Sequence, residues 1–136
     1  YKILGNYIKD MSSETPDIET HIFVKDYISK YQLNIDITSK ALKNKMIEVN
    51  TILKFEDKQE NKKKSYFEIN YSTIVEINDE IKEKKDLEKI ILCDVQIEIY
   101  PKLEKSFLNL LHNSGYPDVK FEKKIDFDQL YSQRLN

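Results

Sequence analysis

The sequence is poor in the residue types that build phosphate loops, metal sites and disulfides. It has two glycines, one cysteine, two histidines and no tryptophan. Gly5 and Gly115 stand far apart, which excludes a glycine-rich phosphate loop. Cys93 has no partner for an internal disulfide, which agrees with a reducing cytosolic compartment. Neither His21 nor His112 lies at metal-ligand spacing from Cys93, so we expect no metal and no cofactor.

Long apolar runs and an excess of one charge are also missing. No apolar run approaches the roughly 20 residues that span a bilayer, and no secretory signal is visible, so we expect a cytoplasmic protein without membrane insertion. The chain carries 22 basic and 24 acidic residues. This balance argues against a nucleic-acid partner, because such binding rests on a basic surface. A chain of 136 residues can bury a sizeable core, so we expect one domain over residues 1–136.

The sequence does contain period-two segments that are typical of half-buried strands. Alternating apolar and polar residues predict four strands, over residues 1–9, 31–37, 46–56 and 66–77. Residues 57–64 form a charged hairpin loop between the last two. Short links and one polar face per strand indicate an antiparallel sheet with one solvated face. Residues 10–17 have the composition of a polar turn, and residues 18–30 fit a loop, a short helix or an edge segment.

The second half of the chain has helical periodicity. Apolar residues three and four positions apart predict one helix over residues 86–95 and another over residues 101–113. Pro101 suits the first turn of the second helix, and Gly115 suits the left-handed position just past its end. Both apolar stripes need a partner surface, and the uncovered face of the sheet supplies one.

A last short helix follows an extended segment over residues 119–125. Asp126 has the position of an N-cap, and the apolar stripe consists of Leu130, Tyr131 and Leu135. Strands grouped first and helices grouped afterwards are typical of an α+β fold. We therefore expect a four-stranded antiparallel sheet with helices packed on one face.

The residues offer little for catalysis. Carboxylates are scattered over exposed strand and helix positions, and the lysine run at residues 62–64 is best interpreted as a solvated hairpin tip. We expect no catalytic residue. A small-ligand enzyme on an α+β fold is a remote alternative, which would require convergent polar groups in an apolar pocket. Nine tyrosines and six phenylalanines favour a binding protein, because aromatic faces and exposed strand edges can hold apolar peptide segments.

Four short motifs stand in order along the chain. Residues 7–16 read Tyr-Ile-Lys-Asp-Met-Ser-Ser-Glu-Thr-Pro, and Tyr100-Pro101, Gly115-Tyr116-Pro117 and Asp126-Phe127-Asp128-Gln129-Leu130-Tyr131 follow. In this order they resemble the Tyr-x-Lys-Asp-Leu-Ser-Phe-Glu-x-Pro, Phe-Pro, Gly-Phe-Pro and Asn-Phe-Asp-Ala-Leu-Tyr elements of SecB, a family of export chaperones. The likeness spans nearly the whole chain, although the middle is similar in pattern more than in identity.

The resemblance implies an ATP-independent holdase in the cytoplasm. Such a chaperone keeps precursor proteins unfolded in long apolar grooves and delivers them to the SecA export motor. It implies the same sheet with helices on one face, assembled as a homotetramer, a dimer of dimers. It also implies that the protein uses no cofactor and has no catalytic residue.

Three sets of site residues are expected. The acidic residues that the family offers to SecA fall, by position, on Asp10, Glu14 and Glu68. Client-binding positions fall on Tyr27, Tyr71 and Ile74. Unpaired sheet edges and partly uncovered helical stripes favour symmetric association, and the helices from residues 86 and 101 are the candidates for the subunit contacts, through Leu87, Ile91 and Leu103.

The sequence departs from the family pattern at four places. Ser13 stands where phenylalanine is usual, Ser72-Thr73 replace a pair of glycines, and Glu104 replaces an arginine. The sequence also stops at Asn136 without the family's acidic tail. The replaced glycines and the missing tail favour an alternative function, a SecB-like chaperone dedicated to one client such as the antitoxin of a toxin–antitoxin system.

Overall fold

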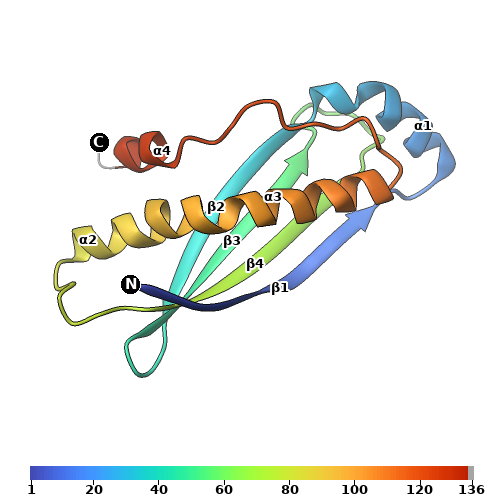
Figure 1. Cartoon of the computed structure of the whole chain (residues 1–136). Coiled ribbons are helices and arrows are strands. Elements are labelled where there is room, and N and C mark those ends of the chain that lie inside the picture. Colours follow the sequence, from blue (N-terminus) through green and yellow to red (C-terminus); the bar gives the residue numbers. More distant parts are fainter. Residues whose placement is uncertain (135–136) are drawn as a thin grey trace.

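A four-stranded antiparallel sheet forms the floor of the molecule (Figure 1). The structure is a computed structural model that describes residues 1–134. Its strands are β1 (Lys2–Glu14), β2 (Gln32–Ala41), β3 (Met46–Glu56) and β4 (Tyr66–Glu76). Their order across the sheet is β1-β4-β3-β2. Strands β2, β3 and β4 thus form consecutive hairpins, while β1 pairs with β4 and leaves β1 and β2 at the two edges.

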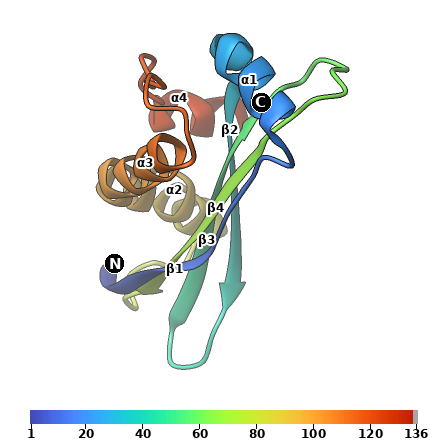
Figure 2. The same ribbon diagram turned by 90° about the vertical axis from the view of Figure 1, so that its right-hand side faces the viewer.

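The helices gather on one face of this sheet. They are α1 (Ile18–Tyr27), α2 (Lys84–Lys89), α3 (Val95–Asn113) and α4 (Phe127–Arg134). Figure 2 shows α2, α3 and α4 on the same side of the strands, with α1 at one end of the sheet. The predicted α+β fold, a four-stranded antiparallel sheet with helices on one face, is confirmed. None of the described helices has the length and apolar character needed to cross a membrane.

The core lies between the sheet and one stripe of α3. The inward side chains of β3 and β4 are buried and face each other across the ladder, as Phe55 does with Phe67. On α3 the buried stripe recurs every fourth residue, at Ile99, Leu103, Phe107 and Leu111. This spacing places all four side chains on one side of a helix. The predicted strands β3 and β4 and the predicted stripe on the long helix are therefore correct in position.

The prediction of two separate helices over residues 86–95 and 101–113 is wrong. Helix α2, a π-helical turn (Ile90–Asp94) and α3 follow one another without a break, and Pro101 lies inside α3. An interior proline costs about 3 kcal/mol, whereas each buried aliphatic side chain on the continuing stripe stabilises by about 1.5–3 kcal/mol. Pro101 and Ile97 are both exposed, so water can bond the carbonyl of Ile97 that lacks its N–H donor.

Strand β1 is longer than the sequence predicts. It continues past Lys9 to Glu14, so the polar turn expected over residues 10–17 is wrong for its first part. The ladder to β4 shifts between Ile3 and Gly5 and again between Ile8 and Asp10. Each shift inserts an extra residue, which changes the phase of the apolar alternation and hides the strand from a period-two count.

The segment over residues 18–30, which the sequence leaves open, is mostly helical. Helix α1 begins after Asp17, whose carboxylate accepts a hydrogen bond from the backbone N–H of Thr20 at 2.7 Å. This bond lowers the pKa of the Asp17 carboxyl. A single 3-10 turn (Ile28–Lys30) then leads into β2.

The chain turns back after α3 as the sequence predicts. Gly115 has φ +104°, the left-handed conformation expected past the helix end, and the N–H of Tyr116 donates to the carbonyl of Leu111 at 3.2 Å. Asp126 caps α4, because its carboxylate accepts from the N–H of Gln129 at 3.0 Å. The predicted stripe residue Leu135 lies outside the described residues.

Candidate functional site

An apolar groove lies between the β2 edge of the sheet and α4. Its cavity of about 220 Å³ is lined by Ile35, Ile37, Leu92, Leu130, Tyr131 and Gln133. Three separate elements thus build it: the inward face of β2, the π-helical turn and α4. Because β2 is an edge strand, its outer backbone N–H and C=O groups are available to a further extended segment. The groove can therefore take apolar side chains and pair with backbone at the same place.

Helix α4 forms one wall of the groove and is held by three contacts. The ring of Phe127 packs edge-on against Tyr100, with centroids 5.3 Å apart. The hydroxyl of Tyr131 donates to the carbonyl of Lys85 at 3.2 Å. The thiol of Cys93 donates to the carboxylate of Asp128 at 3.0 Å. Burial and this carboxylate raise the pKa of Cys93 to about 11, so the thiol is neutral and acts as a hydrogen-bond donor.

A second wall of the groove depends on the buried side chain of Gln96. Its amide Nε2 donates to the carbonyl of Ile91 at 3.1 Å, and its Oε1 accepts from the hydroxyl of Thr51 at 3.0 Å. Gln96 and Thr51 are both fully buried. One side chain thus connects the middle of β3 to the π-helical turn, the element that carries Leu92 of the groove.

The two histidines have structural contacts. The His21 ring packs against the ring of Tyr116 at 5.1 Å, and His112 Nε2 lies 2.9 Å from the carbonyl oxygen of Val119. Tyr116 also shares hydrogen bonds with Thr15 and Ser65. Within residues 1–134, no three His, Cys, Asp or Glu side chains gather in a way that could hold a metal ion.

The acidic residues expected to face SecA lie together on the outer face of the sheet. Asp10 pairs with Asn70, and Glu68 pairs with Ser12 in the same β1–β4 ladder. Directly paired residues of an antiparallel ladder share a face, and this face points away from the helices. Asp10 and Glu14 are exposed, while Glu68 is half-buried and forms an ion pair with Lys54 at 3.7 Å.

The expected client residues do not lie together. Tyr71 faces the core, 3% exposed, and its hydroxyl donates to Asn6 Oδ1 at 2.7 Å. Ile74 lies on the outer face of β4, opposite Gly5. Tyr27 lies on α1 and lines a shallow hollow with Phe23 and its neighbours. The hollow beside Tyr27 has apolar walls from Ile22 and Phe23 and charged walls from Glu19, Asp26 and Lys63.

The three residues expected at a subunit contact also differ in exposure. Leu103 is 0% exposed and Ile91 is 7% exposed, since both pack in the core of this chain. Leu87 is half-buried. A role in subunit contacts stays a prediction, and Leu87 is the one of the three with surface left to offer.

Known proteins have similar sequences. The family model for preprotein translocase subunit SecB matches residues 1–136. A putative protein-export protein SecB of Pelagibacter ubique is 65% identical over 136 residues, which cover 100% of this chain and 97% of the relative. The protein-export protein SecB of Parvibaculum lavamentivorans is 23% identical over 133 residues, 98% of this chain and 77% of the relative.

The fold is also similar to that of a solved structure. A SecB-like chaperone of Mycobacterium tuberculosis, in complex with an antitoxin peptide, superposes with a TM-score of 0.64. It is 10% identical, and the match covers 91% of this chain and 89% of that chain. At this identity the likeness concerns the fold alone. The SecB family model matches the full length of the chain, and the relative in Pelagibacter ubique is 65% identical. The chain therefore belongs to the SecB family of protein-export chaperones.

Proposed function

We propose that this SecB-family chain is a cytoplasmic, ATP-independent holdase that binds unfolded precursor segments in the groove between β2 and α4. The observation that carries the proposal is an apolar groove beside an edge strand. An extended segment can pair with the β2 backbone and place alternate side chains against Ile35, Ile37 and Leu130. Backbone pairing does not depend on sequence, so the groove suits many clients. Folded proteins offer no such free segment.

The energetics favour weak binding at each groove. Burying one large apolar side chain stabilises by about 1.5–3 kcal/mol, while ordering the backbone costs about 1–2 kcal/mol per residue. In an extended segment only every second side chain enters the groove, so these contributions nearly cancel over a short stretch. Firm holding therefore requires several grooves acting on one client. Release of the client then needs no nucleotide, because each weakly bound segment dissociates from its groove on its own.

Capture of a denatured precursor tests the groove. The purified protein, without nucleotide, is mixed with a chemically denatured precursor on dilution, and the complex is measured by size-exclusion chromatography. The Leu130→Glu variant is expected to lose capture, because it places a charge in the groove. Leu42→Glu is the matched control, since Leu42 is 38% exposed and Leu130 is 39% exposed, and Leu42 does not line the groove. Equal capture by both variants would refute the groove.

A chaperone dedicated to one client is the second candidate. The observation in its favour is the fold shared with a SecB-like chaperone that is bound to an antitoxin peptide. The same assay separates the two functions when several unrelated denatured proteins are offered. Capture of all of them supports the general holdase. Failure with every unrelated protein, with a single partner still bound, supports the dedicated chaperone.

The acidic outer face suits a partner with a basic surface, and we propose SecA as that partner. Charge reversal at Asp10, Glu14 or Glu68 is expected to weaken SecA binding. The rise in the dissociation constant should be largest at low salt, where the charges are least screened. Asp36→Lys is the control, because Asp36 lies on the outer face at the opposite edge. Calorimetric titration with SecA, at low and at high salt, measures the dissociation constant of the charge-reversal variants and of the control. A loss of the same size with Asp36→Lys would show a general charge effect and would contradict a docking site on β1 and β4.

We propose that the chain assembles as a homotetramer, as the family resemblance implies, and that the uncovered β1 edge forms one of its two kinds of contact. Leu4, Ile8 and Met11 on this edge strand are 43–46% exposed, which is unusual for a free strand edge. Pairing β1 of two copies would cover these side chains, and a C₂ contact of this kind is self-complementary. Light scattering should give four subunits for the wild type. Ile8→Lys is expected to yield smaller particles, whereas a wild-type monomer at micromolar concentration would overturn the inference.

A further inference from the structure

Three buried acceptor oxygens stand together at the centre of the outer sheet face. They are Ser72 Oγ, Asn50 Oδ1 and Asn70 Oδ1, and none has a hydrogen-bond partner among residues 1–134. Asn50 lies directly opposite Ser72 across the β3–β4 ladder, and Asn70 is the next residue along that face of β4. Ser72 is 0% exposed. Buried polar atoms without partners are rare in native proteins, so a cluster of three calls for a donor.

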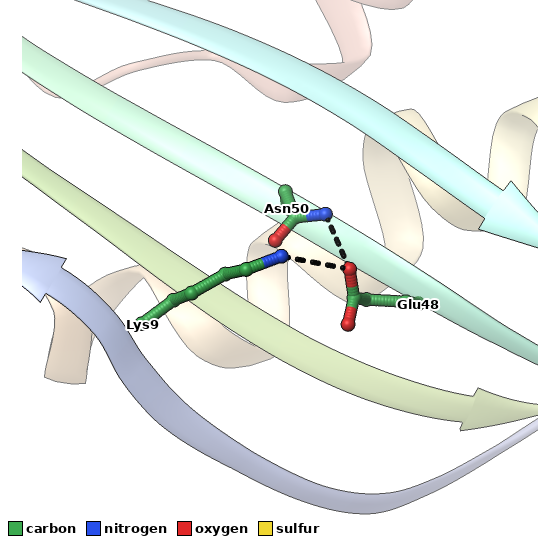
Figure 3. A network of polar contacts seen from close by, with 3 residues as sticks. All are labelled: Lys9, Glu48 and Asn50. Atoms are coloured by element: carbon green, nitrogen blue, oxygen red, sulfur yellow. Dashed lines mark hydrogen bonds and ion pairs between the residues drawn. The ribbon is translucent and has the colours of Figure 1, made fainter.

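Lys9 brings a cation to this cluster from the neighbouring strand. It falls at the second register shift of β1, between Ile8 and Asp10, where the extra residue redirects a side chain. Its ammonium group reaches across β4 to Glu48 Oε1 on β3 at 3.2 Å (Figure 3). The same oxygen accepts from Asn50 Nδ2 at 2.9 Å. Figure 3 shows the carboxamide oxygen of Asn50 on the side of the Lys9 ammonium group.

The Lys9 contact is replaceable. The Lys9 side chain is 44% exposed and that of Glu48 is 18% exposed, and ion pairs of this exposure contribute little to stability. The hydrogen bonds from Asn50 and Lys9 lower the pKa of Glu48, so its carboxylate stays charged. A second cation can therefore take the place of the Lys9 ammonium group without any change in protonation.

An aromatic ring and a second carboxylate border the cluster on β1. Tyr7 pairs with Ser72 on the same face, and the residue is 47% exposed. Asp10 pairs with Asn70. Amide oxygens, a hydroxyl, carboxylates and an aromatic face are the groups that receive organic cations in proteins.

We propose that Glu48, Asn50, Asn70 and Ser72 form a subsite for an arginine side chain of a basic partner protein, and that in the free chain Lys9 blocks this subsite through its ion pair with Glu48. The inference rests on the proposed docking role of the acidic face and refines it. A guanidinium group has five N–H donors in a planar fork, whereas an ammonium group has three. The fork can supply the donors that the three oxygens lack, while its plane stacks on Tyr7. Lys9 then swings into solvent.

The test compares two variants that remove the same charge. Lys9→Met empties the subsite, and Lys40→Met removes a lysine from the same face, since Lys40 pairs with Glu48 in the β2–β3 ladder. Both variants remove one positive charge from the outer face. The charge of Lys40 also acts on Glu48, so a larger gain for Lys9→Met than for Lys40→Met in the binding of a cationic peptide reports release of the direct Lys9 contact and not the loss of a nearby charge.

The probe is a fluorescein-labelled peptide with three arginines spaced by glycine and serine, and its lysine counterpart of equal charge. Binding to the full chain is measured by fluorescence anisotropy. Lys9→Met is expected to raise the affinity for the arginine peptide about fivefold, the upper end for release of an exposed ion pair. Lys40→Met should change it by less than about twofold. Adding Ser72→Ala to Lys9→Met should remove most of the gain.

Three results would overturn the subsite. These are equal gains for Lys9→Met and Lys40→Met, an equal gain for the lysine peptide, and no measurable binding of the arginine peptide to any variant. Capture of denatured precursor is measured on the same samples. If capture succeeds while the two lysine variants behave alike, the subsite is wrong and the holdase stands. If the wild type fails to capture any precursor, the proposed function itself is wrong.

Discussion

Replacing Gln96 by leucine is expected to lower the free energy of unfolding by about 2 kcal/mol, although no surface group changes. Gln96 is fully buried and connects two elements, the carbonyl of Ile91 in the π-helical turn and the hydroxyl of Thr51 in β3. Leucine has a similar volume, so the change removes hydrogen bonds without opening a large cavity. The perturbation therefore isolates the polar contribution.

The magnitude follows from three contributions. The two lost hydrogen bonds contribute about 1 kcal/mol each. The Thr51 hydroxyl, left buried without its acceptor, adds about 1 kcal/mol more. Leucine regains about 1 kcal/mol, because the variant no longer desolvates an amide group. A second substitution, Thr51→Val, should therefore cost about 1–2 kcal/mol in the wild type but restore about 1 kcal/mol in the Gln96→Leu background, where it removes the unpaired hydroxyl.

Urea unfolding followed by far-ultraviolet circular dichroism measures all four proteins of this cycle. The protomer concentration is held fixed, because association shifts the apparent stability. A loss of 2 kcal/mol corresponds to a midpoint shift of about 1 M for a chain of this size. A loss below about 0.5 kcal/mol, or an equal cost of Thr51→Val in both backgrounds, would refute the reasoning. Precursor capture by Gln96→Leu should fall as well, since Leu92 then loses its fixed position.

Two further predictions concern the turn after α3 and the buried thiol. Gly115→Ala should lower the free energy of unfolding by more than about 1 kcal/mol, because φ is +104° and the added Cβ would lie 2.7 Å from His21 Cε1. Gly5→Ala is the control in the same urea titration, because a Cβ added there meets nothing within 4 Å. The pKa of Cys93 rises from 9.0 to about 11 on folding, so the unfolded chain loses this proton first. Stability should therefore fall between pH 9 and 11 more steeply in the wild type than in Cys93→Ala, and parallel pH profiles would contradict the raised pKa.

The sequence predicts the strands where burial alternates without interruption. In β3 and β4 every second residue faces the core, so the period-two pattern and the observed bounds nearly coincide. In β1 two register shifts break the pattern, and five residues of strand were interpreted as a turn. The long helix fails for a different reason. Pro101 is a local signal for a helix start, but tertiary burial of Ile99 and Leu103 on either side of it outweighs that signal.

The groove was not predictable from local pattern, because its walls come from distant parts of the chain. Ile35, Leu92 and Leu130 each belong to an ordinary apolar stripe, and only the packing of α4 beside the β2 edge turns them into one surface. The one feature that could have pointed to the groove is the edge position of β2, and this position follows from the strand order β1-β4-β3-β2. By contrast, the SecB resemblance points to Asp10, Glu14 and Glu68, and the register of β1 against β4 puts all three on one face, while their role toward SecA stays a prediction.

The two proposed binding surfaces lie on opposite faces of one sheet. The groove uses inward side chains at the β2 edge, whereas the acidic subsite uses outward side chains of β1, β3 and β4. Adjacent residues of β3 serve the two sides, since Thr51 anchors the groove wall through Gln96 and Asn50 bonds Glu48 on the outer face. A client in the proposed groove would leave the outer face open, so client and basic partner could be bound at once. Because the two surfaces share no residue, we expect their coupling free energy to be close to zero, and by reciprocity saturating client should leave the affinity for the partner unchanged.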